Sequence, residues 1–86
     1  MDFMFYVYAL KSLKNNDLYI GYSADLRSRF LTHNNGKVRS TKPNRPWRLV
    51  YYEAYLSKED ARKRESQLKK SCYKENLFSR LTCSLK

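Results

Sequence analysis

The order of hydrophobic and polar residues divides the chain into short strands and helices. Residues 3–10 and 18–22 are mostly aromatic and aliphatic, and the turn-forming sequence Lys14-Asn15-Asn16-Asp17 lies between them. Two such runs joined by turn residues are typical of a β-hairpin. Residues 47–55 form a third hydrophobic run and predict a third strand.

Two helices are predicted between and after these strands. Ser23 can cap a helix that runs through Asn34, with Asn35-Gly36 as its stop. Residues 57–60 resemble a capping box and open a helix that continues to about Lys70. Residues 74–81 predict a short last helix. The order β-β-α-β-α-α predicts one small α/β domain over residues 1–86, with a three-stranded antiparallel sheet flanked by helices.

The net charge of the chain indicates which kind of molecule it binds. Lys and Arg total 18 against 8 acidic residues, a formal net charge of +10 in 86 residues. Such an excess favours a polyanion, and a nucleic-acid backbone fits best because its neutralisation releases condensed counterions. A merely soluble basic protein is the alternative. The two cysteines suggest reduced thiols and a cytoplasmic protein, and no signal peptide or membrane span is expected.

One acidic residue stands on the apolar stripe of the second predicted helix. Ala61, Glu65, Leu68 and Cys72 follow one another at helical spacing and share a face. A carboxylate on a core-facing stripe is costly unless it is paired or binds a metal. Glu65 is therefore either an ion-pair partner of a nearby cation or a metal ligand.

The first predicted helix carries a similar pair beside its apolar residues. Arg29 and His33 lie one turn apart, next to the stripe formed by Leu26 and Phe30. Arg29 can bind a phosphate through two hydrogen bonds, and His33 can donate a hydrogen bond or a proton near neutral pH. A solvated helix edge with a structural histidine is the other interpretation.

The predicted hairpin gathers tyrosines near a glycine. Tyr6 and Tyr8 share one face of the first strand, and Tyr19 lies on the strand opposite. Gly21 indicates a bend or a close backbone approach at the end of that strand. Clustered tyrosines usually serve packing, so this pattern alone does not define a site.

Taken together and in this order, these residues resemble the GIY-YIG nuclease superfamily. Tyr6-Val7-Tyr8 stands in place of Gly-Ile-Tyr, and Tyr19-Ile20-Gly21 matches the second half. Arg29, His33 and Glu65 fall at the positions of the family's arginine, histidine and metal-binding glutamate. More closely, the sequence resembles short single-domain bacterial members, which are related to the N-terminal domain of an excision-repair nuclease. The segment RPWRLVYYEAYLSKEDARKRESQLK, residues 45–69, also resembles this group, and the likeness covers roughly residues 4–80.

The sequence departs from the family pattern at two positions. Tyr6 replaces the first glycine, and Tyr22 stands where some repair nucleases carry lysine, so a lysine-assisted step has no counterpart there. Asn76 is only a weak counterpart of the family's late asparagine.

The resemblance implies metal-dependent hydrolysis of DNA phosphodiesters. Glu65 would hold a single Mg²⁺ or Mn²⁺, and Arg29 would stabilise charge in the transition state. Tyr8 or Tyr19 would orient and deprotonate the attacking water, with the phenolate favoured by the metal cation, Arg29 and the basic surroundings. His33 would hydrogen-bond that tyrosine or the phosphate.

Further residues would support this site and hold the substrate. Tyr6, Gly21 and Arg27 are its expected supporting residues. The nucleic-acid backbone, DNA or RNA, would contact a basic set that comprises Lys37, Arg39, Lys42, Arg45 and Arg48. A second copy of the chain or a targeting partner would fit so small a nuclease, and DNA repair would suit it. The alternative function is a non-catalytic module that binds nucleic acid on a nuclease fold.

Overall fold

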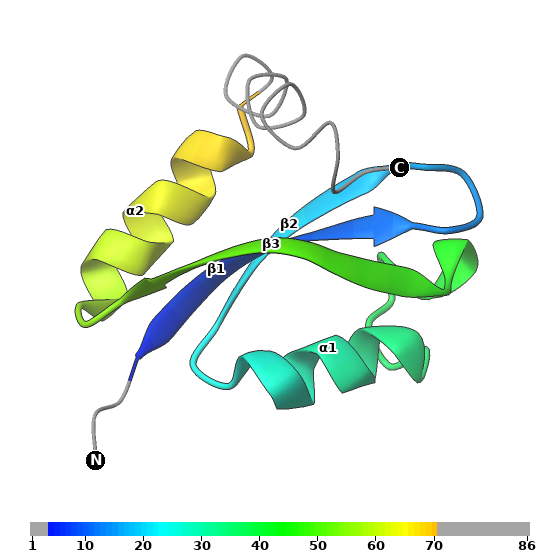
Figure 1. The fold of residues 1–86 in the computed structure, drawn as a ribbon, viewed down its shortest axis with the longest axis horizontal. Coiled ribbons are helices and arrows are strands. Elements are labelled where there is room, and N and C mark those ends of the chain that lie inside the picture. Colours follow the sequence, from blue (N-terminus) through cyan, green and yellow to red (C-terminus); the bar gives the residue numbers. More distant parts are fainter. Residues whose placement is uncertain (1–3, 71–86) are drawn as a thin grey trace.

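The protein is described from a computed structural model, over residues 4–70. Within them, a three-stranded antiparallel sheet consists of β1 (Phe5–Ser12), β2 (Leu18–Ser23) and β3 (Trp47–Tyr55). The strand order is β2-β1-β3, so the first strand is central and the other two form the edges. Figure 1 shows helix α1 (Leu26–Asn34) and helix α2 (Lys58–Leu68) on opposite sides of this sheet. The predicted fold class is confirmed.

The hairpin forms where the turn residues predicted it. Asn16 adopts a positive φ of 64°, and its N–H donates to the Ser12 carbonyl at 3.0 Å. Strand β1 continues two residues beyond its predicted end at Leu10, because Lys11 still pairs with both neighbouring strands and Ser12 with β3. A register shift between Ala9 and Leu10 in the pairing with β3 accompanies this extension.

The first helix begins later than predicted. Ser23 is the last residue of β2, and its hydroxyl closes a tight turn by accepting from the Asp25 N–H at 2.9 Å. Asp25 is the actual N-cap, since its side chain accepts from the Ser28 N–H at 3.1 Å. The predicted stop is confirmed, because Gly36 takes a φ of +76° directly after the helix.

The second helix begins as predicted. The Ser57 side chain accepts from the Asp60 N–H at 3.3 Å, and the helix ends at Leu68 rather than at Lys70. The predicted last helix over residues 74–81 lies outside the described residues. The loop between α1 and β3 holds one 3₁₀ turn, Lys42–Asn44. No helix within residues 4–70 is long and apolar enough to cross a membrane.

Alternation along the strands gives the sheet two packed faces. The face under α2 contains Val7, Ala9, Leu18 and Ile20, packed with Ala61 and Leu68 of the helix. The opposite face contains Tyr8, Leu10 and Trp47, packed with the partly buried Leu26 and Phe30 of α1. The predicted apolar stripe of α2 is thus confirmed at Ala61 and Leu68, while Cys72 lies outside the described residues.

Candidate active site

Three of the predicted residues form one ring cluster on the α1 side of the sheet. The rings of Tyr19 and His33 meet edge to face with centroids 5.0 Å apart. The Tyr8 ring lies 5.8 Å from His33 and 6.5 Å from Tyr19. The hydroxyl of Tyr8 is 2.8 Å from Nε2 of His33. Residues from β1, β2 and α1 are therefore brought together as the sequence predicted.

Gly21 makes room for this cluster rather than bending the chain. It lies inside β2, opposite Tyr8, without a positive φ. The far end of the Tyr8 ring crosses directly over Gly21, and a Cβ built there would overlap its Cζ and hydroxyl. The predicted bend is wrong. The close approach is real, but it is made by a side chain, because only a residue without Cβ leaves space for that ring.

His33 is fully buried, and both of its ring nitrogens are engaged. Nδ1 lies 2.8 Å from the Thr41 hydroxyl, and Nε2 faces Tyr8. Burial, with a smaller contribution from the positive charge of Arg29, lowers the pKa of His33 to about 4. The imidazole is therefore neutral at pH 7 and has no nitrogen left to contact a phosphate directly. Of the two predicted partners, the structure supports the tyrosine.

Tyr8 is a neutral phenol. Burial raises its pKa to about 12, although a hydrogen bond from Arg29 and the charge of that residue oppose the shift. Desolvation of a side chain only 1% exposed outweighs the guanidinium, so Arg29 by itself does not favour a Tyr8 phenolate. Arg29 itself is exposed at the edge of the cluster, where a phosphate can reach it.

Glu65 lies on α2, which packs on the sheet face opposite the ring cluster. Its carboxylate is among the groups that raise the pKa of Tyr8. Its side chain is 20% exposed, and Oε2 lies 3.2 Å from Nζ of Lys69, one turn along α2. Ion pairing, one of the two interpretations of this residue, is thus present. An i,i+4 pair at the surface is weak, so it does not prevent a metal ion from competing for the carboxylate.

The donor set suits one kind of metal ion. Within residues 4–70 no group of three His, Cys, Asp or Glu residues could hold a metal. One accessible carboxylate fits a hard cation that keeps most of its water ligands and binds substrate oxygens, as Mg²⁺ does. It does not fit a zinc site, which needs three or four protein ligands.

Two predicted supporting residues lie apart from the ring cluster. Tyr6 packs edge to face on Tyr52 of β3, with centroids 6.0 Å apart. Together with Arg27 and Phe30 it lines an open groove of about 750 Å³ between the sheet and the start of α1. Tyr6 and Tyr8 share a sheet face as predicted, but Tyr6 lines the groove whereas Tyr8 belongs to the ring cluster.

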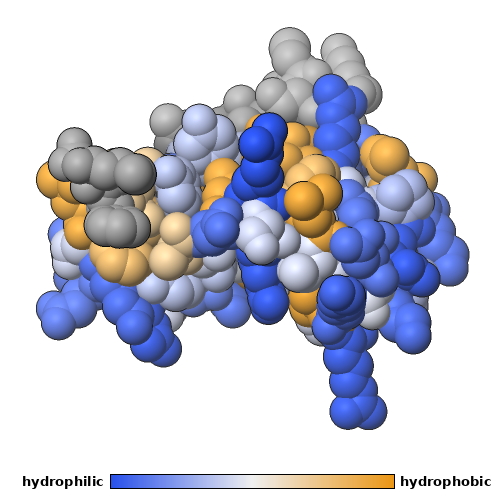
Figure 2. Space-filling view, turned by 90° about the horizontal axis from the view of Figure 1, so that it is seen from below, coloured by the Kyte–Doolittle hydropathy of each residue, from blue (hydrophilic) through white to orange (hydrophobic). Residues whose placement is uncertain are grey.

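The predicted backbone-binding residues lie at the surface. All five are exposed, namely Lys37, Arg39, Lys42, Arg45 and Arg48. Arg45 also makes contacts within its own loop. Its Nε donates to the Lys42 carbonyl at 3.0 Å, and its guanidinium lies over Gly36. Figure 2, which views the protein from the α1 side, shows hydrophilic side chains over much of this face. The five basic side chains are therefore accessible to a polyanion.

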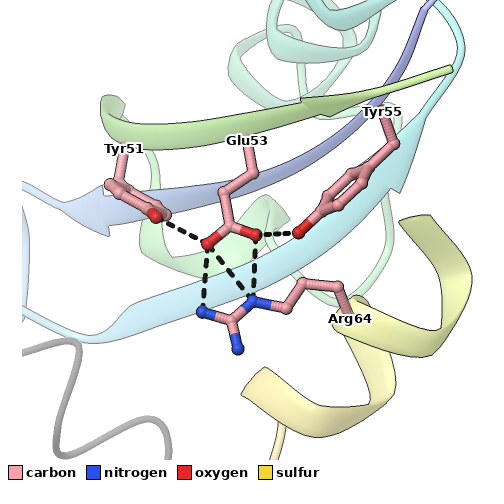
Figure 3. Close-up of polar contacts among 4 residues, drawn as sticks. All are labelled: Tyr51, Glu53, Tyr55 and Arg64. Carbon is pink, nitrogen blue, oxygen red and sulfur yellow. Dashed lines mark hydrogen bonds and ion pairs between the residues drawn. The ribbon is translucent and has the colours of Figure 1, made fainter. Parts of the chain in front are cut away.

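A second polar cluster, which sequence reasoning missed, joins β3 to α2. Figure 3 shows the Glu53 carboxylate between the hydroxyls of Tyr51 and Tyr55, both of which donate to it. Arg64 donates from Nε at 2.9 Å and from Nη2 at 3.1 Å. These donors hold the pKa of Glu53 below its usual range even though burial opposes them. The cluster anchors the helix that carries Glu65.

The fold and the tyrosine, histidine and arginine cluster define a nuclease-type domain. The model of the GIY-YIG catalytic domain matches residues 4–77. The chain therefore belongs to the GIY-YIG family, which is a family of nucleases.

Within this family, the chain is similar to several bacterial UPF0213 proteins. The chain is 46% identical over 65 residues to the UPF0213 protein SH2523 of Staphylococcus haemolyticus, covering 74% of this chain and 78% of that protein. It is 38% identical over 71 residues to a UPF0213 protein of Streptococcus pneumoniae, covering 81% and 71%. The solution NMR structure of the UPF0213 protein BH0048 from Bacillus halodurans is 37% identical, with a TM-score of 0.56 over 88% of this chain and 83% of that one. The short single-domain relatives expected from the sequence are confirmed.

Proposed function

We propose that this protein is a metal-dependent endonuclease that hydrolyses phosphodiester bonds in DNA. The observation that carries the proposal is the buried Tyr8–His33 pair with Arg29 at its edge. A neutral tyrosine bonded to a neutral histidine, next to an exposed guanidinium, is a proton path beside a phosphate-binding group. Neither core packing nor simple DNA binding requires that combination.

Substrate binding would begin at the surface cations. The exposed basic residues of the loop and of β3 would contact backbone phosphates without reading base sequence. Arg29 would hold the phosphate that is to be cut, because it is exposed and near enough to Tyr8 to oppose the rise in the pKa of that phenol. A phosphate on Arg29 would therefore lie next to the Tyr8 oxygen. The guanidinium would also stabilise the charge that accumulates on the phosphate in the transition state.

Water activation would use Tyr8 as a relay. A water molecule in line with the phosphorus would give a proton to the Tyr8 oxygen while the phenol proton passes to Nε2 of His33. This route forms no free phenolate, so the raised pKa of Tyr8 does not block it. Tyr19 would then be a packing partner for both rings, and Tyr8 would be the tyrosine that activates water.

Glu65 would bind the divalent cation through its carboxylate. When bound, such an ion would polarise a phosphate oxygen and stabilise the leaving group. Lys69 would give up its ion pair at little cost, because exposed pairs contribute about 0–1 kcal/mol.

A cleavage assay with matched variants tests this function. Labelled duplex, single-stranded, flapped and four-way DNA would be incubated with Mg²⁺, Mn²⁺ or EDTA. Glu65→Gln should lower cleavage at least 100-fold while the mobility shift on DNA is kept. Glu59→Gln is the control, since Glu59 is an exposed carboxylate in the first turn of the same helix.

The outcomes separate the candidate functions. Cleavage that needs the metal and is lost only in Glu65→Gln would support the nuclease. DNA that is bound by the wild-type protein but never cut, with affinity falling steeply as salt rises, would instead indicate a binding module. Equal cleavage by both variants would rule out Glu65 as the metal ligand.

A further inference from the structure

Thr41 is a buried polar residue at the end of the proposed proton path. It is fully buried, and its hydroxyl lies 2.8 Å from Nδ1 of His33. Its backbone is fixed independently, because its carbonyl accepts from the indole N–H of Trp47 at 2.7 Å and its own N–H donates to the Val38 carbonyl at 3.1 Å. The loop therefore holds the backbone of Thr41 in place without help from His33.

The contacts of the Thr41 hydroxyl determine which way its bond to His33 runs. Oγ1 also lies 3.3 Å from the carbonyl oxygen of Val38. A carbonyl can only accept, so this contact is a hydrogen bond when the single hydroxyl proton of Thr41 points to Val38. In that orientation the remaining lone pairs of Oγ1 accept from His33, which places the histidine proton on Nδ1.

The other end of the path leads to the same assignment. Within residues 4–70, the Tyr8 hydroxyl has its hydrogen bond with Nε2 of His33. If Nε2 donated to that oxygen, the buried hydroxyl proton of Tyr8 would have no acceptor there. With Nε2 unprotonated, each donor in the series Tyr8, His33 and Thr41 meets one acceptor.

We propose that Thr41 is a positioning residue that holds His33 in the tautomer protonated at Nδ1, with Nε2 free to accept the proton of Tyr8. In the opposite tautomer Nε2 would already carry a proton and could not receive another. The effect on catalysis rests on the proposed nuclease function, whereas the tautomer itself does not.

The substitutions Thr41→Val and Thr41→Ser separate the hydroxyl from the shape of the side chain. Valine keeps the branched shape and removes the acceptor, so the buried Nδ1–H of His33 would lack a partner. Serine keeps the acceptor and removes only the methyl group. Backbone contacts to Trp47 and Val38 remain in both variants.

Long-range ¹H–¹⁵N NMR at neutral pH reads the tautomer directly. His33 is the only histidine in the chain, so the spectrum contains one pair of imidazole nitrogens. We expect protonated Nδ1 in the wild type and in Thr41→Ser, and a loss or mixture of that state in Thr41→Val. Protonated Nε2 in the wild type would overturn the proposal, and so would an unchanged Thr41→Val spectrum. If Thr41→Val does not fold, the wild-type and Thr41→Ser spectra still show which nitrogen of His33 carries the proton.

Kinetics on a DNA that the wild type cuts supply the second readout. Thr41→Val should lower kcat roughly 10- to 100-fold with little change in KM, as is usual when a partner that orients a functional histidine is lost. Thr41→Ser should retain most of the activity. Equal kcat values for Thr41→Val and the wild-type enzyme would overturn the positioning role. Absence of cleavage in the wild type would refute the nuclease, while the NMR result would still test the tautomer.

Discussion

Replacing Gly21 with alanine tests the packing on which the site depends. The added methyl group would overlap Cζ and the hydroxyl of Tyr8 and would lie 2.9 Å from its Cε2. Tyr8 cannot move aside freely, because it is 1% exposed and its hydroxyl is bonded to His33. The ring must therefore shift within a packed layer, or the two strands must separate.

The expected cost follows from these contacts. Overpacking a buried site costs about 1–3 kcal/mol. Losing the bond between Tyr8 and His33 adds about 1 kcal/mol, and the lower entropy of the unfolded alanine chain offsets roughly 0.5 kcal/mol. A net loss of about 1.5–3.5 kcal/mol should lower Tm by roughly 6–28 °C in a domain of this size.

Thermal unfolding followed by circular dichroism measures this loss. Tyr8→Phe, alone and combined with Gly21→Ala, provides a double-mutant cycle. Removing the hydroxyl relieves part of the overlap, so the double variant should lose less stability than the sum of the single losses. A Gly21→Ala protein that unfolds within a degree or two of the wild type would refute the placement of Tyr8 over Gly21.

Two further predictions concern the other buried polar groups. The stability of the protein should fall as the pH drops from about 6.5 towards 4, by up to about 3 kcal/mol, because the unfolded chain protonates His33 near its ordinary pKa while the native pKa is about 4. Urea titrations at several pH values measure this slope; an identical slope in His33→Gln would contradict the assignment. Glu53→Gln should cost about 1–3 kcal/mol, since Arg64 would lose its charged acceptor, while Glu59→Gln should change little. Equal urea midpoints for the Glu53 and Glu59 variants would show that the cluster does not anchor α2.

Local sequence signals were sufficient for the fold. The three hydrophobic runs, the asparagine-rich turn and Gly36 predicted the sheet and the end of α1, because each depends on neighbouring residues only. The prediction that Ser23 caps the first helix was wrong, because Asp25 is the N-cap. Both Ser23 and Asp25 are good capping residues, and the choice between them depends on how far β2 continues its pairing with β1.

The site was only partly visible in the sequence. Tyr8, Arg29 and His33 were found through family resemblance and helical spacing, and the structure places them together. Thr41 gave no local signal, since one threonine in a basic loop looks like any other turn residue. Its importance arises from His33, eight residues away, and from the anchor at Trp47.

The position of Glu53 in its strand could have predicted the second polar cluster. In the run Tyr51-Tyr52-Glu53-Ala54-Tyr55, alternation places Glu53 on the same face as Tyr51 and Tyr55. A carboxylate between two tyrosines on a strand face that packs on a helix needs a cation, and Arg64 on the capped helix was available. The pairing itself could not be derived, because it depends on how α2 crosses the sheet.

On the proposed mechanism, burial divides the site into groups that move a proton and groups that carry charge. Tyr8 and His33 are buried and neutral, while Arg29 is exposed and Glu65 is partly exposed. Passing a proton to His33 creates an imidazolium beside Arg29, which is unfavourable until a phosphate gains negative charge in the transition state. The same burial that makes Tyr8 a poor phenolate therefore makes water activation depend on a bound phosphate.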